Sequence, residues 1–250
     1  MPTALFLSPH LDDVAFSCGG TVARLAATGW RCIIATAFTS SVVHPTGFAL
    51  TCQTDKGIAA DIDYMALRRT EDTVAAVALG AEALWLGYPE APHRGYRSAV
   101  ELFAGIHPQD TIHESLAGRL SDLCRSLHPA RVFVPQGLGN HADHLQLIRA
   151  ACVSVSRDTI AWYRDAPYAL RNPGAEPPAV ATGWPGFIVP IGGYLTDKLN
   201  ASAAYRTQLD FQFGGDAAMR EALSVFACVE GEGWPAERFL GQIPDGVSLL

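Results

Sequence analysis

The sequence has little charge and no concentration of basic residues. Of its 250 residues 17% are charged, and 18 Lys and Arg stand against 25 Asp and Glu, so the formal net charge is −7 at pH 7. No run of five or more Lys or Arg occurs. Because binding to a phosphate backbone requires a clustered cationic surface, the composition argues against a nucleic-acid partner.

Long hydrophobic runs and paired cysteines are also missing. No window reaches the ~18 apolar residues of a membrane-spanning helix, so no span is expected. None of the six cysteines forms a Cys-x-x-Cys pair, which argues against a disulfide scaffold. The first residues show no basic segment and too short an apolar stretch for a signal peptide. We therefore expect a reduced, cytoplasmic protein.

Hydrophobic residues make up 49% of the chain, and in the first 155 residues they follow two alternating patterns. Nearly continuous apolar runs, typical of buried parallel strands, lie at residues 4–8, 31–38, 82–86 and 131–135. Apolar residues at helical spacing lie in residues 64–79, 112–127 and onward from 143. Because strands and helices alternate, we predict a doubly wound α/β fold with a mostly parallel sheet and helices on both faces.

The pattern weakens after residue 155. We expect further strands at 158–164 and 187–189, a Pro- and Gly-rich connection at 171–185, and helices within 195–210 and 216–227. We predict one domain over residues 1–250, in which residues 1–155 form the core with the functional site and residues 156–250 a C-terminal cap that completes it.

Two long connections follow predicted strands, at residues 39–63 and 87–110. Connections of this length without secondary structure are usually functional or disordered. Both follow the carboxyl ends of strands, where open α/β sheets bind ligands. We therefore expect these two loops to decide specificity.

Two polar clusters also follow predicted strands directly. Residues 8–13 read Ser-Pro-His-Leu-Asp-Asp, and residues 139–144 read Gly-Asn-His-Ala-Asp-His. Alone, an Asp pair after a strand is most often a helix N-cap, and a His-x-x-His pair on a helix is most often surface decoration. Because the carboxyl ends of parallel strands meet at one edge, we expect the clusters to lie together, and their joint occurrence favours a functional site.

Three of these side chains form a metal-ligand set. His10 and Asp13 are three residues apart and share one side of a helical turn. With His144 they supply two imidazoles and one carboxylate, which suits Zn²⁺ with positions open for water and substrate. The same set binds non-haem Fe²⁺, so both metals remain open.

The remaining polar side chains of the clusters suit acid–base chemistry. Asp12 neighbours a ligand and can take the proton of a water that a metal activates. His141 can stabilise an oxyanion or protonate a leaving amine. Asp143 can hydrogen-bond an imidazole and fix its tautomer.

These residues resemble a known family, the LmbE-like (PIG-L) zinc-dependent de-N-acetylases. The matching motifs are Pro9-His10-Leu11-Asp12-Asp13, Cys18-Gly19-Gly20 and His141-Ala142-Asp143-His144. The resemblance covers roughly residues 3–155 and implies a Rossmann-like fold that removes acetyl groups from N-acetylated amino sugars. It implies as zinc ligands His10, Asp13 and His144. It also implies Asp12 as the general base and His141, supported by Asp143, as the electrostatic or acid partner.

Arg68 is a further match to the family. The run Arg68-Arg69-Thr70-Glu71 resembles the family's Arg-x-x-Glu helix, in which the Arg faces the substrate pocket. The alternative is an ordinary helical ion pair of Arg68 with Glu71 or Asp72.

Other segments also bear on the resemblance. Val14 stands where many family members have Glu, and Leu11 replaces the commoner Pro, which favours a branch acting on glycosylated secondary metabolites such as glycopeptide antibiotics. Residues Lys198, Tyr205 and Gln208 and the stretch 237–239 resemble the family's C-terminal region, or form a surface helix and a tail.

The sequence thus predicts a zinc-dependent amidohydrolase that removes an N-acetyl or longer N-acyl group from an amino-sugar conjugate. The expected partner is this small molecule, and a homo-oligomer is compatible with the sequence. One alternative is an amidase on a non-sugar conjugate with the same site, which a panel of N-acyl substrates would separate. Another is a metal- or sugar-binding module without turnover, in which Asp12 would be replaceable without consequence.

Overall fold

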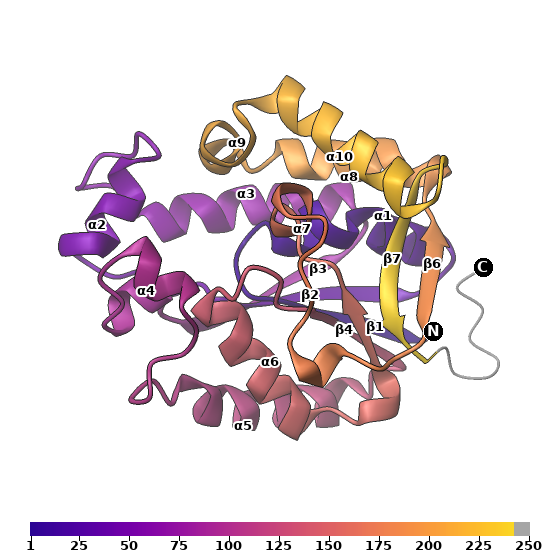
Figure 1. Ribbon diagram of the computed structural model, residues 1–250, viewed down its shortest axis with the longest axis horizontal. Coiled ribbons are helices and arrows are strands. Elements are labelled where there is room, and N and C mark those ends of the chain that lie inside the picture. Colours follow the sequence, from indigo (N-terminus) through magenta and orange to yellow (C-terminus); the bar gives the residue numbers. More distant parts are fainter. Residues whose placement is uncertain (243–250) are drawn as a thin grey trace.

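The computed structural model describes residues 1–242 and centres on a seven-stranded sheet of order β3-β2-β1-β4-β5-β7-β6 (Figure 1). Its strands are β1 (Thr3–Ser8), β2 (Arg31–Phe38), β3 (Glu82–Tyr88), β4 (Arg131–Pro135), β5 (Ile160–Tyr163), β6 (Gly186–Pro190) and β7 (Ala236–Gly241). Strands β1 to β5 pair in parallel, whereas β7 runs antiparallel to both β5 and β6. The mostly parallel sheet that the sequence predicts is confirmed.

Helices cover both faces of this sheet. The α-helices are α1 (Asp13–Ala27), α2 (Gly47–Thr54), α3 (Tyr64–Ala78), α4 (Ala99–Phe103), α5 (Ile112–Leu127), α6 (Ala142–Ser154), α7 (Tyr168–Arg171), α8 (Leu195–Ala203), α9 (Arg206–Phe213) and α10 (Asp216–Glu230). Short 3-10 turns are η1 (Ala91–Arg94), η2 (Arg157–Thr159), η3 (Ala179–Ala181) and η4 (Gly192–Tyr194). One apolar cluster joins the sheet to α1, α3, α8 and α10, and a second joins its other face to α5 and α6 (Figure 1).

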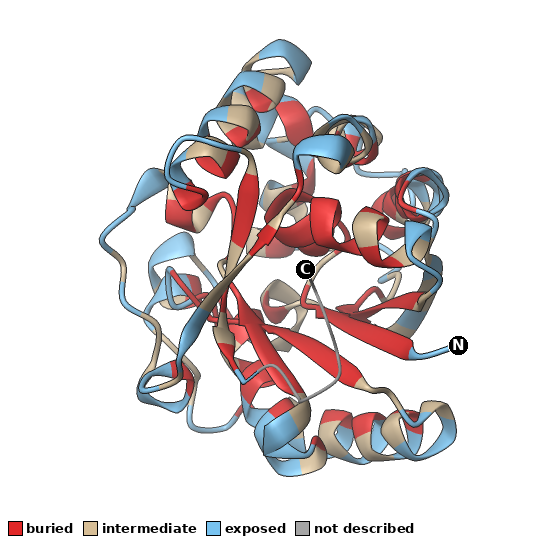
Figure 2. Ribbon diagram, turned by 90° about the vertical axis from the view of Figure 1, so that its right-hand side faces the viewer, coloured by how far each residue is buried: buried red, intermediate tan, exposed pale blue. Residues whose placement is uncertain are grey.

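The central strands are almost wholly buried, and exposed residues gather on the outward faces of the helices (Figure 2). Strands β1 and β4 have no exposed residue, because helices cover both of their faces. None of the helices in residues 1–242 is both long and apolar enough to cross a bilayer.

The C-terminal third adds strands to the same sheet rather than only covering it. Strand β7 inserts between β5 and β6, and the sequence interpretation of its residues 237–239 as a tail is wrong. The helical stretch 195–210 divides into α8 and α9. Residues 243–250, the end of the predicted C-terminal segment 156–250, lie outside the described residues.

The two long connections contain short helices that the sequence pattern did not indicate. Residues 39–63 include α2, and residues 87–110 include η1 and α4. Helix α2 buries only Ala49 and Gln53, so its sequence carries almost no helical periodicity. These helices stand beside the carboxyl edge of the sheet (Figure 1).

Helix α1, which carries Asp13, is kinked by an ion pair from the C-terminal third. Cys18 has non-helical φ and ψ of −137° and 26°. The Ser17 carbonyl accepts a hydrogen bond from Lys198 Nζ at 3.1 Å, while the Thr21 N–H donates to Glu237 Oε2 at 2.7 Å. Lys198 Nζ lies 2.7 Å from Glu237 Oε1, so this pair replaces the helical bond between Ser17 and Thr21.

Lys198 and Glu237 are both buried, which rules out the alternative of a surface helix face and a tail. The Gly19-Gly20 pair lies at the kink, where a Cβ on Gly20 would stand 2.7 Å from Ile191 Cδ1. Close packing thus excludes larger residues at Gly20.

Candidate active site

The two polar clusters meet at the point where the strand order reverses. From β1 the chain proceeds outward to β2 and β3 on one side, and through β4 to β5 on the other. Open α/β sheets bind ligands in the crevice at such a switch point. The residues after β1 and β4 converge there, as the sequence predicts. Their ligand atoms lie within 4.8 Å of one another in two groups that share His10, one with Asp13 and His144 and one with His141 and Asp143.

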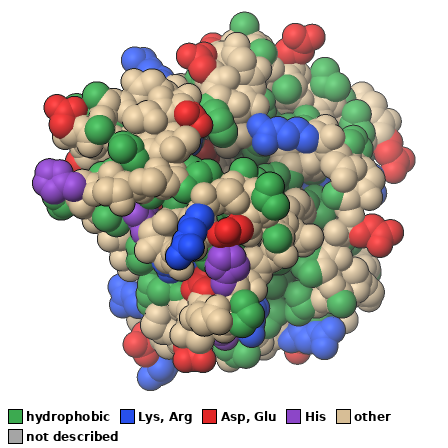
Figure 3. All heavy atoms as spheres, turned by 60° about the vertical axis from the view of Figure 1, so that its left-hand side comes forward, with side chains coloured by type: hydrophobic (Ala, Val, Ile, Leu, Met, Phe, Trp, Pro, Cys, Tyr) green, Lys and Arg blue, Asp and Glu red, His purple; other side chains and the backbone are tan. Residues whose placement is uncertain are grey.

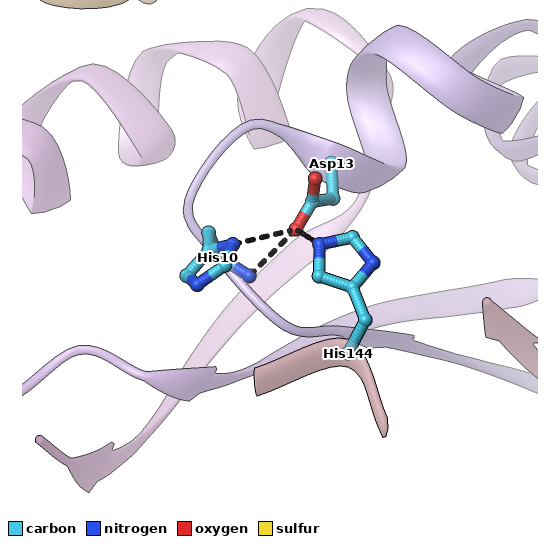
Figure 4. Close-up of side chains that lie close together, drawn as sticks. All are labelled: His10, Asp13 and His144. Atoms are coloured by element: carbon cyan, nitrogen blue, oxygen red, sulfur yellow. Dashed lines mark hydrogen bonds and ion pairs between the residues drawn. The ribbon is translucent and has the colours of Figure 1, made fainter. Parts of the chain in front are cut away.

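His10, Asp13 and His144 point their donor atoms at one another (Figure 4). Asp13 Oδ2 lies 3.2 Å from His10 Nδ1 and 3.4 Å from His144 Nε2. His144 Nε2 is buried and makes no hydrogen bond with the part of the chain that the structure describes. A buried nitrogen lone pair facing a carboxylate oxygen and a second imidazole fits a divalent metal ion.

Each of these two imidazoles contacts a further carboxylate through the ring nitrogen that faces away from Asp13. His10 Nε2 lies 3.0 Å from Asp143 Oδ2, and His144 Nδ1 lies 2.6 Å from Asp165 Oδ1. Because a carboxylate only accepts, each contacting ring nitrogen carries a proton, so in the neutral ring the opposite nitrogen, which faces the centre, is the one that can bind a metal. The two carboxylates therefore fix the tautomer that a metal site needs.

Electrostatics within the triad favour an ionised carboxylate. Burial alone raises the pKa of Asp13, but the adjacent His144 and His10 rings outweigh it and hold the pKa well below its ordinary value. Asp13 and Asp165 in turn raise the pKa of His144 to about 9 against the opposing effect of burial. A metal bound here would have to displace a proton from this ring.

Asp143 contacts an imidazole at hydrogen-bond distance, as the sequence predicts, but the ring is that of His10 and not that of His141, which the family resemblance implies. Its carboxylate contacts His10, accepts from the Ala91 N–H at 3.0 Å and pairs with Arg94 Nη1 at 2.7 Å. Only its backbone N–H reaches His141, donating to Nδ1 at 3.2 Å. The carboxylate therefore orients His10, and the helix N-terminus orients His141.

His141 is placed as a neutral hydrogen-bond donor. Burial and the nearby His10 lower the pKa of His141 well below its ordinary value. Since Nδ1 accepts the backbone hydrogen bond, the neutral ring carries its proton on Nε2. This N–H can stabilise developing negative charge in the cavity that the ring lines.

Asp12 occupies a strained turn beside the metal-ligand set. Its φ of 145° and ψ of −33° lie outside the regions that non-glycine residues ordinarily adopt. Such outliers concentrate at functional sites. Burial raises the pKa of Asp12 to about 7, with Arg68 opposing this, and the carboxyl is not a ligand of the triad.

Arg68 holds this turn in place. Its Nη2 donates to the Leu11 carbonyl at 2.7 Å and lies 3.3 Å from Asp12 Oδ2, while Nη1 contacts Glu90 Oε1 at 2.9 Å. The residue lines the cavity, as the family resemblance implies. The alternative helical ion pairs are not formed, because the carboxylates of Glu71 and Asp72 bond to Thr207, Trp85 and Tyr205.

Comparison with known proteins decides the family. Residues 5–155 match the model of PIG-L, described as GlcNAc-PI de-N-acetylase. The chain belongs to the PIG-L family. A curated relative, the 2'-N-acetylparomamine deacetylase of Streptomyces fradiae, is 28% identical over 228 residues, covering 88% of this chain and 76% of the relative.

Solved structures share the PIG-L fold over nearly the whole chain. A deacetylase from the teicoplanin biosynthesis pathway superposes with a TM-score of 0.84 at 23% identity, covering 98% of this chain and 100% of the other. The zinc inhibited form of teicoplanin deacetylase gives a TM-score of 0.79 at 22% identity, with the same coverage. At these identities the likeness supports the fold alone.

Three residues of this site were not predicted from the sequence. Asp165 orients His144, Glu90 pairs with Arg68, and Arg94 pairs with Asp143. Asp165 and Glu90 each come two residues after a strand, β5 and β3. The rule that polar residues after parallel strands gather at one edge would have found both.

A cavity of about 300 Å³ opens over this site. Its floor includes His10, Asp12, Asp13 and His141, and its walls come from the connections 39–63 and 87–110 and from α7 and α9. A volume of this size suits a small ligand. The connections expected to decide specificity therefore do line the cavity.

Proposed function

We propose that this PIG-L family member is a metal-dependent hydrolase that removes an N-acetyl or longer N-acyl group from an amino sugar, with Zn²⁺ as its metal. The observation that carries the proposal is the convergence of His10 Nδ1, Asp13 Oδ2 and His144 Nε2 beside the strained Asp12. The deacetylase relatives support the reaction. The zinc inhibited form of one structural neighbour supports metal binding, and the choice of zinc rests on the set of two imidazoles and one carboxylate.

The chain's own residues fit the steps of amide hydrolysis. A metal held by His10, Asp13 and His144 would supply Lewis-acid activation of the amide carbonyl and of water. Asp12 would take the proton of the attacking water. His141 would donate a hydrogen bond from its Nε2–H to the oxyanion. The proton that Asp12 takes would then pass to the leaving amine, because an amide needs its nitrogen protonated to depart.

We further propose a glycosylated secondary metabolite as the substrate. The relatives are deacetylases of 2'-N-acetylparomamine and of the teicoplanin pathway, both with amino-sugar chemistry. We place the protein in the cytoplasm, in keeping with its six free cysteines. One domain that includes the C-terminal strands is our proposal for the chain's organisation.

The direct test is release of free amine from methyl 2-acetamido-2-deoxyglucopyranoside by zinc-loaded protein. Wild type should release amine, and Asp12→Asn should retain zinc while turnover falls about 10²–10⁴-fold, because the proton acceptor is lost. Amine release only from N-acyl compounds without a sugar would support the amidase alternative. Zinc binding with no turnover of any N-acyl compound would support the alternative of a binding module without catalysis. Full turnover by Asp12→Asn would show that Asp12 is not the general base.

A further inference from the structure

The mouth of the cavity is built from three short helices, each contributing one phenylalanine. Phe48 on α2, Phe103 on α4 and Phe211 on α9 all line the cavity. Phe103 is 40% exposed and Phe211 55% exposed, although aromatic side chains of this size are usually covered. Figure 3 brings this side of the molecule forward and shows hydrophobic side chains interleaved with charged ones and histidine.

The aromatic lining is continuous with the reaction centre. The Phe103 ring packs edge-on against His141 at a centroid distance of 5.3 Å and against Tyr168 at 5.9 Å. A substrate whose amide lies between Asp12 and His141 would therefore direct a neighbouring part of the molecule past Phe103 toward the mouth. The cavity extends from this contact to Phe211.

Two cationic side chains stand among these rings. Lys56 Nζ lies 4.6 Å from the centre of the Phe211 ring and donates to the Cys52 carbonyl at 2.6 Å. Among residues 1–242 no carboxylate forms an ion pair with it. Arg171 Nη2 bonds the Gln212 carbonyl at 3.0 Å and its side-chain oxygen at 2.7 Å.

Carboxylates offset these two cations only in part at the mouth. Of the acidic lining residues, Glu90 is paired with Arg68 and Asp143 with Arg94, while Asp12 and Asp13 belong to the floor of the cavity. Asp55 is the further acidic residue of the lining. Lys56 and Arg171 outnumber Asp55 at the mouth, and this excess of positive charge disfavours a positively charged group there.

We propose that Phe48, Phe103 and Phe211, with Lys56, form a subsite for an aromatic, uncharged or anionic aglycone on the amino sugar. This inference rests on the proposed function and extends it to the part of the substrate away from the amide. Aromatic rings beside charged groups suit a flat group with polar substituents. A fatty acyl chain would instead favour a closed apolar channel, because it would desolvate Lys56 and Arg171 without replacing their hydrogen bonds with water.

Binding measured without turnover tests the subsite directly. Isothermal titration calorimetry would compare 4-nitrophenyl and methyl glucosaminide, the free amines, on zinc-loaded protein. Wild type should bind the aryl glycoside about fivefold to tenfold more tightly, the range expected for aromatic contacts. Phe103→Ala and Phe211→Ala should reduce this ratio, whereas Val100→Ala, an exposed residue of α4 outside the lining, should retain it.

Equal affinity for the two glycosides, or a ratio that the phenylalanine variants leave unchanged, would overturn the subsite. Preference for aryl glycoside without amine release from any N-acetyl glucosaminide would refute the proposed function and leave the subsite standing. The two failures are therefore distinguishable.

Kinetic measurements on cationic substrates and on substrates with a longer acyl group test whether the subsite binds the aromatic aglycone. Wild type should have a higher kcat/KM for 4-nitrophenyl N-acetylglucosaminide than for 2'-N-acetylparomamine, whose amines are protonated at neutral pH. Lys56→Glu should narrow this preference, since it replaces a cation by an anion at the mouth. A higher kcat/KM for the cationic substrate would overturn the assignment of the subsite to an aromatic aglycone. So would a preference for an N-octanoyl over an N-acetyl group that Phe211→Ala removes, because the subsite would then bind the acyl chain.

Discussion

At the scale of single residues, the candidate site depends on which ring nitrogen of each histidine is free. Asp143 fixes the tautomer of His10 and Asp165 that of His144, so in each neutral ring the nitrogen that faces Asp13 is the one free to bind a metal. Preorganisation of this kind raises metal affinity, because no tautomer has to change on binding. The carboxylates behind the ligands are therefore part of the metal site.

Asp165→Asn tests this role of the second carboxylate. An amide at position 165 can donate to His144 Nδ1 and stabilise the wrong tautomer, so zinc affinity should fall about 10–100-fold. Competition with a zinc-binding chromophore measures this, with Asp158→Asn on the exposed η2 turn as a matched control. Unchanged affinity in Asp165→Asn would show that the carboxylate has no positioning role.

Sequence reasoning found the triad but not its supports. His10, Asp13 and His144 belong to two dense polar clusters after clear strands, so their meeting could be predicted from topology alone. Asp165 stands singly after a short strand in the weakly patterned third of the chain. Its place two residues after β5 is a signal that it lies at the same edge, but the histidine that it orients can be identified only in the folded structure.

At the scale of elements, the kink in α1 is the feature that the sequence pattern does not predict. The periodicity of α1 does not predict that two side chains more than 170 residues away replace one of its backbone hydrogen bonds. Lys198 comes from α8 and Glu237 from β7, so the C-terminal third fixes the path of the helix that starts at Asp13. Such long-range pairs are invisible to local patterns.

Breaking this pair should destabilise the fold strongly. Glu237→Gln leaves Lys198 buried without its charge partner, which should lower the free energy of unfolding by about 3–5 kcal/mol. Urea denaturation followed by circular dichroism measures the change. The double variant with Lys198→Met should be less destabilised than the sum of the single variants.

Glu232→Gln provides the comparison for that measurement. Its side chain is 80% exposed and pairs with Arg238, so the change should stay below about 1 kcal/mol. Equal losses for Glu232→Gln and Glu237→Gln would contradict the assignment of the buried pair as a structural support for α1.

At the scale of the whole molecule, ion pairs of Arg94 connect residues 87–110 to the carboxyl edge of the sheet. Arg94 bridges Asp143 and Asp110, with Nη1 at 2.7 Å from the former and Nη2 at 2.8 Å from the latter. Although burial opposes it, Arg94 lowers the pKa of Asp110 below its model-compound value of 3.8. The unfolded chain therefore binds more protons than the folded chain as Asp110 titrates.

The sign of this shift gives a pH prediction. Asp110 contributes stability that is complete above about pH 4 and is lost as the pH falls through its lowered folded-state pKa. Asp110→Asn should therefore be less stable at pH 7 and lose less stability on acidification, measured by urea denaturation between pH 7 and pH 2. Asp61→Asn, on an exposed turn, should lose stability on acidification as wild type does. An equal loss of stability between pH 7 and pH 2 in wild type and both variants would contradict this role of Asp110.

We infer that this fold assembles a metal site from residues at the ends of two strands. Elemental analysis of wild type, His144→Ala and the exposed control His44→Asn, purified in parallel, tests it most directly. We predict about one equivalent of zinc in wild type and the control, and its loss in His144→Ala, because two of three ligands hold the ion poorly. Wild type without metal after reconstitution, or full zinc in His144→Ala, would contradict the claim.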